Sequence, residues 1–229
     1  MEFIIISIIS IILVIILKYL FGYNIRKIKE IAENKELDEI SKKYPSNVEI
    51  CKEYLQKLNN QDVKIEENKD TEASLYIALT NKISIANISK SYTRIQTIAH
   101  ECLHSIQDRK LLIFNFIFTN IYLIYFVIIS IMAILKLLPY ELMFLTILLL
   151  LGLVYYSVRV YLENDAMIKA RYLAKEYLEE KKISDDEEIN KIVSGFDYIN
   201  NIGIKCVNYN LFFGIMVKVL IFSIMCIVR

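Results

Sequence analysis

The sequence predicts a mainly α-helical integral membrane protein with a small β element and about four transmembrane helices. Of the 229 residues, 55% are hydrophobic, while only 5 are Gly and 2 are Pro. This composition is unusual for a soluble domain. The apolar residues are concentrated in four stretches, each long enough to cross a bilayer as a helix. These stretches are residues 3–21, 111–138, 140–158 and 211–228.

Two polar segments separate the apolar stretches and define five expected regions. These are an N-terminal transmembrane anchor (1–21), a first polar segment (22–110), a transmembrane hairpin (111–158), a second polar segment (159–210) and a C-terminal transmembrane helix (211–229). The anchor is expected to remain uncleaved, because Met1-Glu2 carries no positive charge, the apolar core is long and no small-residue cleavage site follows. Lys218 falls inside the last stretch. It is expected to face another helix, a water-filled space or a headgroup, or to be tolerated on a marginal span.

The basic residues indicate how the chain is oriented in the membrane. Of the 27 Lys and Arg residues, 15 lie in residues 22–110 and 8 in residues 159–210. The positive-inside rule places both segments in the cytoplasm, and an even number of spans then places both termini outside. Acidic residues accompany the basic ones, so the net charge is only +1. The apolar stretches make the lipid bilayer an expected partner. Nucleic acid is not an expected partner, because the chain has no excess of positive charge to bind it.

The first polar segment is expected to contain three helices and two short strands. An amphipathic helix is indicated around residues 25–31, and a second helix around residues 46–58. Alternation of polar and apolar residues predicts strands at 62–66 and 82–86. Apolar residues then recur at helical intervals over 93–110, which predicts the third helix.

The third of these helices carries the most informative motif. Thr93 and Gln96 have capping-box spacing at its start. The only two histidines of the chain, His100 and His104, lie four residues apart within it, with Glu101 between them. This is the HExxH zinc signature, in which two imidazoles on one helix face bind a metal ion and the glutamate polarises a water molecule. The alternative is a pair of structural or solvated histidines with this spacing by chance.

The strand before this helix suggests a place for a substrate. In many zinc proteases such a strand forms the lip of the cleft, and an extended substrate pairs with its free edge. Ile83, Ser84 and Ile85 are therefore candidates for substrate binding. The alternative is that they belong to a core strand, because edge status is not readable from one sequence.

The second polar segment is expected to supply the third metal ligand. Its periodicity predicts a long helix over residues 161–178, an acidic turn at 184–188 and a further helix through 192–202. A catalytic zinc requires three protein ligands, so a carboxylate or a cysteine must join the two histidines. Glu163 is the best candidate, because the hairpin returns the chain to the membrane face that His104 left.

Two alternatives remain open for the residues around this candidate. Glu163 is also explained as an acid that the helix dipole favours at the N-terminus of its own helix. Asp165 lies two residues further and is expected either to brace the site from the neighbouring helix or to cap the start of its helix. The four cysteines show no CxxC pair, and a cytoplasmic setting disfavours disulfides. Cys102 is expected to pack on the far side of the HExxH helix.

In combination, these elements resemble the YugP-like membrane-bound neutral zinc metallopeptidases, HExxH gluzincins related to the HtpX and CAAX-type membrane proteases. The resemblance covers nearly the whole chain. It rests on the order of anchor, helix, two strands, HExxH helix with the trailing Gln107, hairpin, the Glu-Asn-Asp-Ala element at 163–166 and a terminal span. It implies a cytoplasmic zincin-like catalytic core in which His100, His104 and Glu163 bind one zinc ion per chain. Glu101 would be the general base.

The expected function is that of a membrane-embedded, zinc-dependent endopeptidase. Its substrates would be membrane-associated or unfolded polypeptides, cleaved at the cytoplasmic face. The alternative is a catalytically degenerate membrane interaction module with the same fold. A small-molecule carrier is disfavoured, because the spans lack paired buried charges and the polar residues are concentrated outside them.

Overall fold

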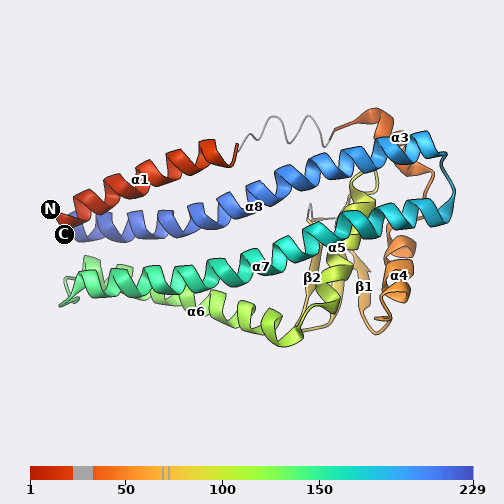
Figure 1. Ribbon diagram of the computed structural model, residues 1–229. Helices are drawn as coiled ribbons and strands as arrows, with labels where there is room; N and C mark the ends of the chain where they lie inside the picture. Colours follow the sequence, from red (N-terminus) through yellow and green to blue (C-terminus); the bar gives the residue numbers. More distant parts are fainter. Residues whose placement is uncertain (23–32, 69, 72, 229) are drawn as a thin grey trace. The chain divides into compact units, whose positions relative to one another are not determined.

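A computed structural model describes residues 1–22, 33–68, 70–71 and 73–228 of the chain (Figure 1). The described residues are mainly α-helical with one small three-stranded sheet, which confirms the fold class in outline. The helix expected around residues 25–31 lies outside them. The helices are α1 (Glu2–Leu20), α3 (Lys35–Lys42), α4 (Asn47–Lys57), α5 (Arg94–Ile106), α6 (Arg109–Ile134), α7 (Glu141–Lys181) and α8 (Asp186–Val228). The strands are β1 (Lys64–Glu67), β2 (Leu75–Ile77) and β3 (Lys82–Ile85).

The described residues form two compact units. The first unit consists of α1, residues 114–161 and the part of α8 that begins at Lys205. The second unit consists of residues 33–113 and 162–204. It contains the sheet, α5 and most of the two polar segments. Helices α7 and α8 each contribute to both units.

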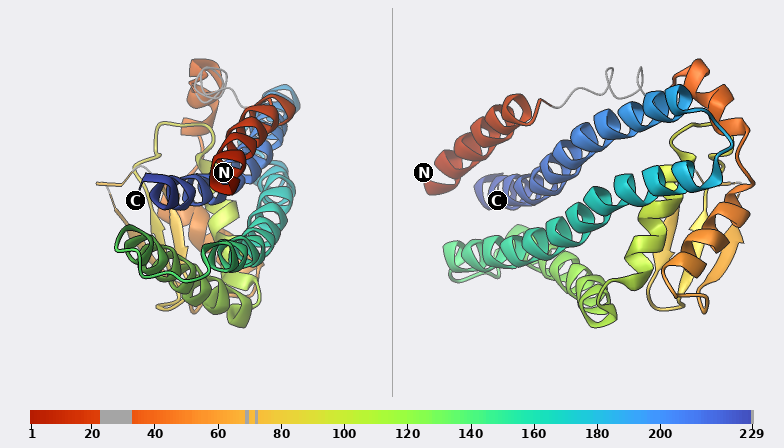
Figure 2. Two further views of the ribbon diagram at one scale, coloured as in Figure 1. Left: turned by 90° about the vertical axis from the view of Figure 1, so that its left-hand side faces the viewer. Right: turned by 45° about the vertical axis from the view of Figure 1, so that its right-hand side comes forward.

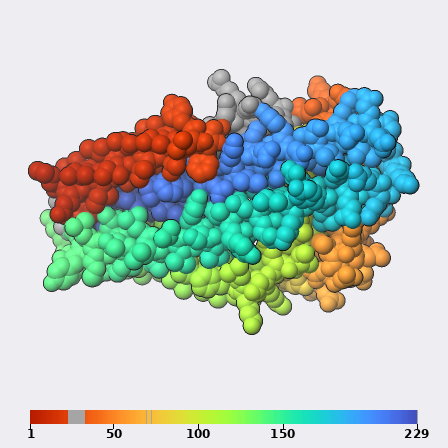
Figure 3. Space-filling view, viewed as in Figure 1, coloured from red at the N-terminus to blue at the C-terminus, as the bar shows by residue number. Residues whose placement is uncertain are grey.

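The first unit contains the apolar parts of the long helices. Helices α1, α6, α7 and α8 are each long and apolar enough to cross a membrane, as the four apolar stretches predicted. The side chains of Ile4, Ile8 and Ile12 on α1 are about half exposed, and α1 can be seen in red in the space-filling view (Figure 3). Apolar side chains that point outward in this way suit a lipid environment.

Lys218 of α8 faces another helix of the first unit, which was one of the alternatives for this residue. Its Nζ donates a hydrogen bond to the Gly214 carbonyl at 3.3 Å and lies 5.2 Å from the centre of the Tyr122 ring on α6. A cation over an aromatic face is stabilised by the charge distribution of the ring. The lysine is therefore accommodated within the helix bundle.

Helices α7 and α8 are longer than the sequence patterns indicated. Helix α7 continues without a break for 41 residues, through the expected boundary between hairpin and second polar segment. Helix α8 joins the helix expected at 192–202 to the C-terminal span and has 43 residues. Hydrophobicity changes where a helix leaves a membrane, but the backbone hydrogen bonds of the helix do not. At 1.5 Å per residue, α7 is about 60 Å long.

The sheet of the second unit has the strand order β1-β3-β2. Strand β3 lies in the middle, parallel to β1 and antiparallel to β2. In this register Ser84 is opposite both Glu66 and Leu75. The expectation of a free edge at Ile83, Ser84 and Ile85 is therefore wrong, and the alternative of a core strand is correct.

Helices α4 and α5 pack against each other and against the sheet (Figure 2). Helix α4 begins where it was expected, because the Ser46 hydroxyl accepts a hydrogen bond from the Glu49 N–H. The capping box expected at the start of α5 is absent, since the Thr93 side chain makes no hydrogen bond to the helix and bonds to the Ser91 hydroxyl instead. The apolar side chains between these elements form the core of this unit, with Ile50, Ile83 and Ile98 fully buried.

Arg94 fixes the start of α5 in place of a capping side chain. It is buried, and its guanidinium donates hydrogen bonds to five oxygen atoms between Ser41, near the end of α3, and Asn47, at the start of α4. These acceptors are Ser41 Oγ at 3.0 Å, the Ser41 carbonyl at 2.7 Å, the Tyr44 carbonyl at 2.9 Å, the Pro45 carbonyl at 2.7 Å and Asn47 Oδ1 at 3.0 Å. The first turn of the HExxH helix is thereby held to the loop before α4.

Candidate metal centre

The two histidines lie on one face of α5, as their spacing predicted. Their Nε2 atoms are 3.0 Å apart, and their rings meet edge to face with centroids 4.5 Å apart. Cys102 lies on the opposite side of the helix, where its Sγ is 3.6 Å from Sγ of the buried Cys51 on α4. Both thiols are free. Helix α5 therefore presents its imidazoles to one side and packs into the core with the other.

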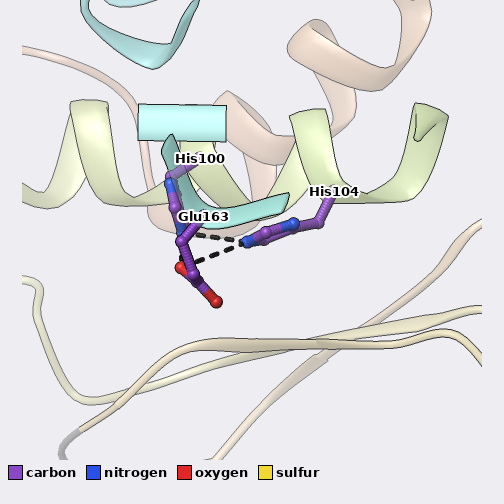
Figure 4. A group of neighbouring side chains, drawn as sticks. All are labelled: His100, His104 and Glu163. Carbon is purple, nitrogen blue, oxygen red and sulfur yellow. Dashed lines mark hydrogen bonds and ion pairs between the residues drawn. The ribbon is translucent and has the colours of Figure 1, made fainter. Parts of the chain in front are cut away.

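Glu163 approaches the histidines from α7 (Figure 4). Its Oε2 lies 3.4 Å from His100 Nε2 and 3.7 Å from His104 Nε2. All three side chains are largely buried, with exposed fractions of 19% for His100, 10% for His104 and 12% for Glu163. Because Glu163 lies well inside a helix that begins at Glu141, the alternative of an acid at a helix N-terminus does not apply.

The three ligand atoms are placed as a metal ion requires. Around an ion bound at about 2.0 to 2.2 Å in tetrahedral geometry, neighbouring ligand atoms lie about 3.4 Å apart. The observed separations of 3.0, 3.4 and 3.7 Å match this spacing. Within the part of the chain that the structure describes, His100, His104 and Glu163 are the one group of three such side chains that could hold a metal ion. The donor set and its geometry therefore fit a metal.

Glu101 lies beside the histidines but turns toward the sheet. Its side chain is only 6% exposed, and its Oε2 accepts a hydrogen bond from the Tyr76 N–H of β2 at 2.7 Å. Burial raises the pKa of Glu101, and the neighbouring His100 and His104 oppose that shift. One carboxylate oxygen is thus held by the backbone, and the other is not used by this contact.

The edge of the sheet near Glu101 is β2, a strand that the sequence analysis did not predict. Strand β2 has only three residues and lies at the end of the strand order. In an antiparallel pair, successive residues point their backbone groups alternately toward and away from the partner strand. The Tyr76 N–H that reaches Glu101 belongs to this edge strand. A backbone amide leaves no signal in the residue type, so sequence patterns could not have indicated this contact.

A chain of hydrogen bonds joins His104 to α7. His104 Nδ1 is 2.8 Å from Oε1 of Gln107, and Nε2 of Gln107 donates to the Leu162 carbonyl at 2.9 Å and to Asp165 Oδ2 at 3.0 Å. Asp165 therefore braces the site from the neighbouring helix, which was one of its two expected roles. It does not cap a helix, since it lies inside α7. Partial burial opposes ionisation, but hydrogen bonds from Lys169 and Gln107 hold the pKa of Asp165 below its ordinary value.

Comparisons with known proteins leave the site to be judged on its own geometry. No protein-family model matches the chain, and neither a curated protein nor a solved structure matches it. The resemblance to the YugP-like peptidases therefore remains a prediction. What the structure provides is a group of two imidazoles and one carboxylate, with a second buried carboxylate next to it.

Proposed function

We propose that the protein is a membrane-embedded, zinc-dependent endopeptidase. The observation that carries the proposal is the convergence of His100, His104 and Glu163 with the buried carboxylate of Glu101 beside them. The histidines come from α5 and the third ligand comes from α7, almost sixty residues further along the chain. A chance pair of histidines on one helix has no reason to meet a buried carboxylate from another element.

The ligand set favours zinc in a catalytic role. Catalytic zinc sites use three protein ligands, such as three histidines or two histidines and one carboxylate, and leave one position open, whereas structural sites are closed by four protein ligands and are rich in cysteine. Here the set has three members, and the nearby Cys102 points away from it. A zinc ion bound by these residues would supply Lewis-acid polarisation of a peptide carbonyl and of the attacking water.

Glu101 is the general base in this proposal. Its carboxylate takes a proton from the attacking water and then transfers it to the amine that leaves. Burial raises the pKa of Glu101 and makes it a stronger base than an exposed glutamate. The Tyr76 N–H holds one oxygen of the carboxylate, so the side chain keeps its orientation while the other oxygen exchanges the proton.

The proposed substrates are membrane-associated or unfolded polypeptides at the cytoplasmic face. The four helices of membrane-spanning length among the described residues support a location in the bilayer, and the distribution of Lys and Arg supports the cytoplasmic side for the site. Glu163 follows the apolar stretch 140–158 by only five residues, which is about 8 Å along a helix. An HExxH helix beside a small sheet with a short edge strand also supports a zincin-like core and the YugP-like resemblance.

Metal content tests the proposal most directly. The detergent-purified wild type is expected to contain about one zinc per chain by elemental analysis, and H104A and E163A are expected to lose it. E179A is a matched control, because Glu179 is an exposed carboxylate on the same helix α7 and pairs with the surface Lys175 at 3.7 Å. Absence of zinc from the wild type after purification without chelators would favour the degenerate interaction module.

A further inference from the structure

Gln107 occupies the position at which α5 ends. Its backbone is extended, with φ −67° and ψ 162°, and its N–H bonds to the His104 carbonyl at 3.2 Å. The chain leaves the helix here, and α6 begins two residues later at Arg109. The side chain of Gln107 consequently folds back by three residues to reach the ring of His104.

The contact with His104 determines which ring nitrogen carries a proton. A histidine that binds a metal through Nε2 must carry its proton on Nδ1, and the partner at Nδ1 must then be an acceptor. Oε1 of Gln107 is that acceptor, at 2.8 Å. The arrangement leaves His104 Nε2 free to face His100 and Glu163, as a metal ligand requires.

The other end of the same amide binds α7 on both sides of Glu163. Nε2 of Gln107 donates to the carbonyl of Leu162 and to the carboxylate of Asp165. A side-chain amide has two acceptor lone pairs and two donor hydrogens, so it can accept from an imidazole and donate to two oxygens at once. A carboxylate at this position could accept from His104 but could not donate to α7. An ammonium could donate to α7 but could not accept from His104.

We propose that Gln107 is a positioning residue that fixes the tautomer and orientation of His104 and joins α5 to α7 beside Glu163, with Asp165 acting through it. The inference rests on the metal site proposed above. It assigns no chemical step to Gln107. Its effect is on how well the two helices present their ligands to one ion.

The test measures zinc affinity by competition with a chelator in the full-length protein. Loss of a hydrogen-bond partner behind a metal ligand typically lowers metal affinity about 10- to 100-fold, and we expect a loss of that size in Q107A. D165A should weaken binding less, because Leu162 still accepts from Gln107. In the double variant Q107A/D165A the second substitution should have no further effect. Full additivity would show that Asp165 does not act through Gln107.

A spectroscopic measurement separates positioning from general loosening of the structure. The chain has only two histidines, so selective ¹⁵N-histidine labelling gives few signals in an NMR spectrum. With zinc bound, the wild type should show a His104 Nδ1–H that exchanges slowly with solvent, and Q107A should lose it. D165N retains an oxygen acceptor and should restore zinc affinity relative to D165A, even though its ion pair with Lys169 at 2.6 Å is lost.

Two control variants alter neighbouring contacts without touching the proposed chain of hydrogen bonds. K169A removes the other partner of Asp165. N60A removes the hydrogen bonds that Asn60 donates to Ser105 near the end of α5, at 3.0 Å to its carbonyl and 2.9 Å to its hydroxyl. Both should keep wild-type zinc affinity. Unchanged affinity in Q107A and D165A overturns the inference, whereas absence of zinc from the wild type overturns the proposed function instead.

Discussion

The two ends of α5 both carry buried polar side chains, but those side chains are satisfied in different ways. At the N-terminal end, every nitrogen of the Arg94 guanidinium donates to an oxygen atom of the chain. Toward the C-terminal end, the Nε2 atoms of His100 and His104 converge on each other and on a carboxylate oxygen of Glu163. The first arrangement is complete without any ligand. The second brings together three lone-pair donors, which is the arrangement that a cation completes.

The comparison shows how a structural polar cluster differs from a binding site. Burial lowers the pKa of Arg94, but its hydrogen bonds compensate the guanidinium, which stays charged far above neutral pH. We therefore assign Arg94 to the stability of the second unit and the two histidines to its chemistry. Substitution of Arg94 should therefore change stability, and substitution of the histidines should change metal binding.

The largest expected effect is on catalysis and comes from E101Q. Glutamine has the shape of glutamate but cannot take a proton, so peptide cleavage should fall about 10²- to 10⁴-fold. Zinc content and thermal stability should stay near wild type, since neither ligand set nor core changes. Cleavage is measured with a quenched-fluorescent peptide. Wild-type cleavage by E101Q, with zinc present, would rule out Glu101 as the base.

The next largest effect is on stability and comes from R94M. Methionine fills much of the same volume but leaves several buried carbonyl oxygens without donors, and the free energy of unfolding should fall by about 3 kcal/mol. Chemical denaturation in detergent measures this loss. As a control, R171M removes a partly exposed arginine that pairs with Asp197 at 3.1 Å, and should cost less than about 1 kcal/mol. Equal losses in the two variants would contradict the structural role of Arg94.

A third prediction concerns removal of the metal. At a free zinc concentration one hundred times the dissociation constant, the wild type should gain about 2.7 kcal/mol of stability over the metal-free form. H104A should gain nothing, yet its metal-free form should be nearly as stable as the metal-free wild type. Thermal melts with zinc and with chelator provide the measurement. Equal stabilisation of H104A by zinc would place the bound ion elsewhere.

The smallest expected effect distinguishes the starts of α4 and α5. S46A removes a side-chain cap and should cost about 1 kcal/mol. T93A should change stability by less than about 0.5 kcal/mol, because the Thr93 side chain makes no hydrogen bond to its helix and Arg94 holds that end. Melting curves of the two variants, recorded side by side, test the difference. A larger loss in T93A than in S46A would restore the capping box that the sequence suggested.

Local patterns predicted the parts of the molecule that depend on local physics. The four apolar stretches predicted α1, α6, α7 and α8, which are long and apolar enough to cross a membrane, and apolar periodicity placed α4 and most of α5 correctly. The HExxH spacing indicated that His100 and His104 share a helix face, and chain topology suggested Glu163 as their partner. These features follow from residue spacing and from the return of the chain through a hairpin.

The features that sequence patterns missed depend on pairing between distant segments. Alternation predicts a strand at 82–86, but only the pairing with β1 and β2 makes β3 the central strand. The capping spacing of Thr93 and Gln96 was overridden by the tertiary contacts of Arg94. Gln107 lies three residues after His104, and this spacing is a sequence signal for the contact between the two side chains. Its second contact, with α7, could not be predicted without the fold.

The unbroken course of α7 constrains how the chain can change in length. Within the second unit its buried positions recur every four residues, at Leu162, Ala166, Ala170 and Ala174. One residue inserted between Glu163 and Ala166 would rotate Glu163 relative to the three alanines by about 100°. If the alanines kept their places in the core, Glu163 would then turn away from His100 and His104. Insertions or deletions between Glu163 and Ala174 should therefore be tolerated only in multiples that restore the helical phase, such as seven residues, which complete about two turns.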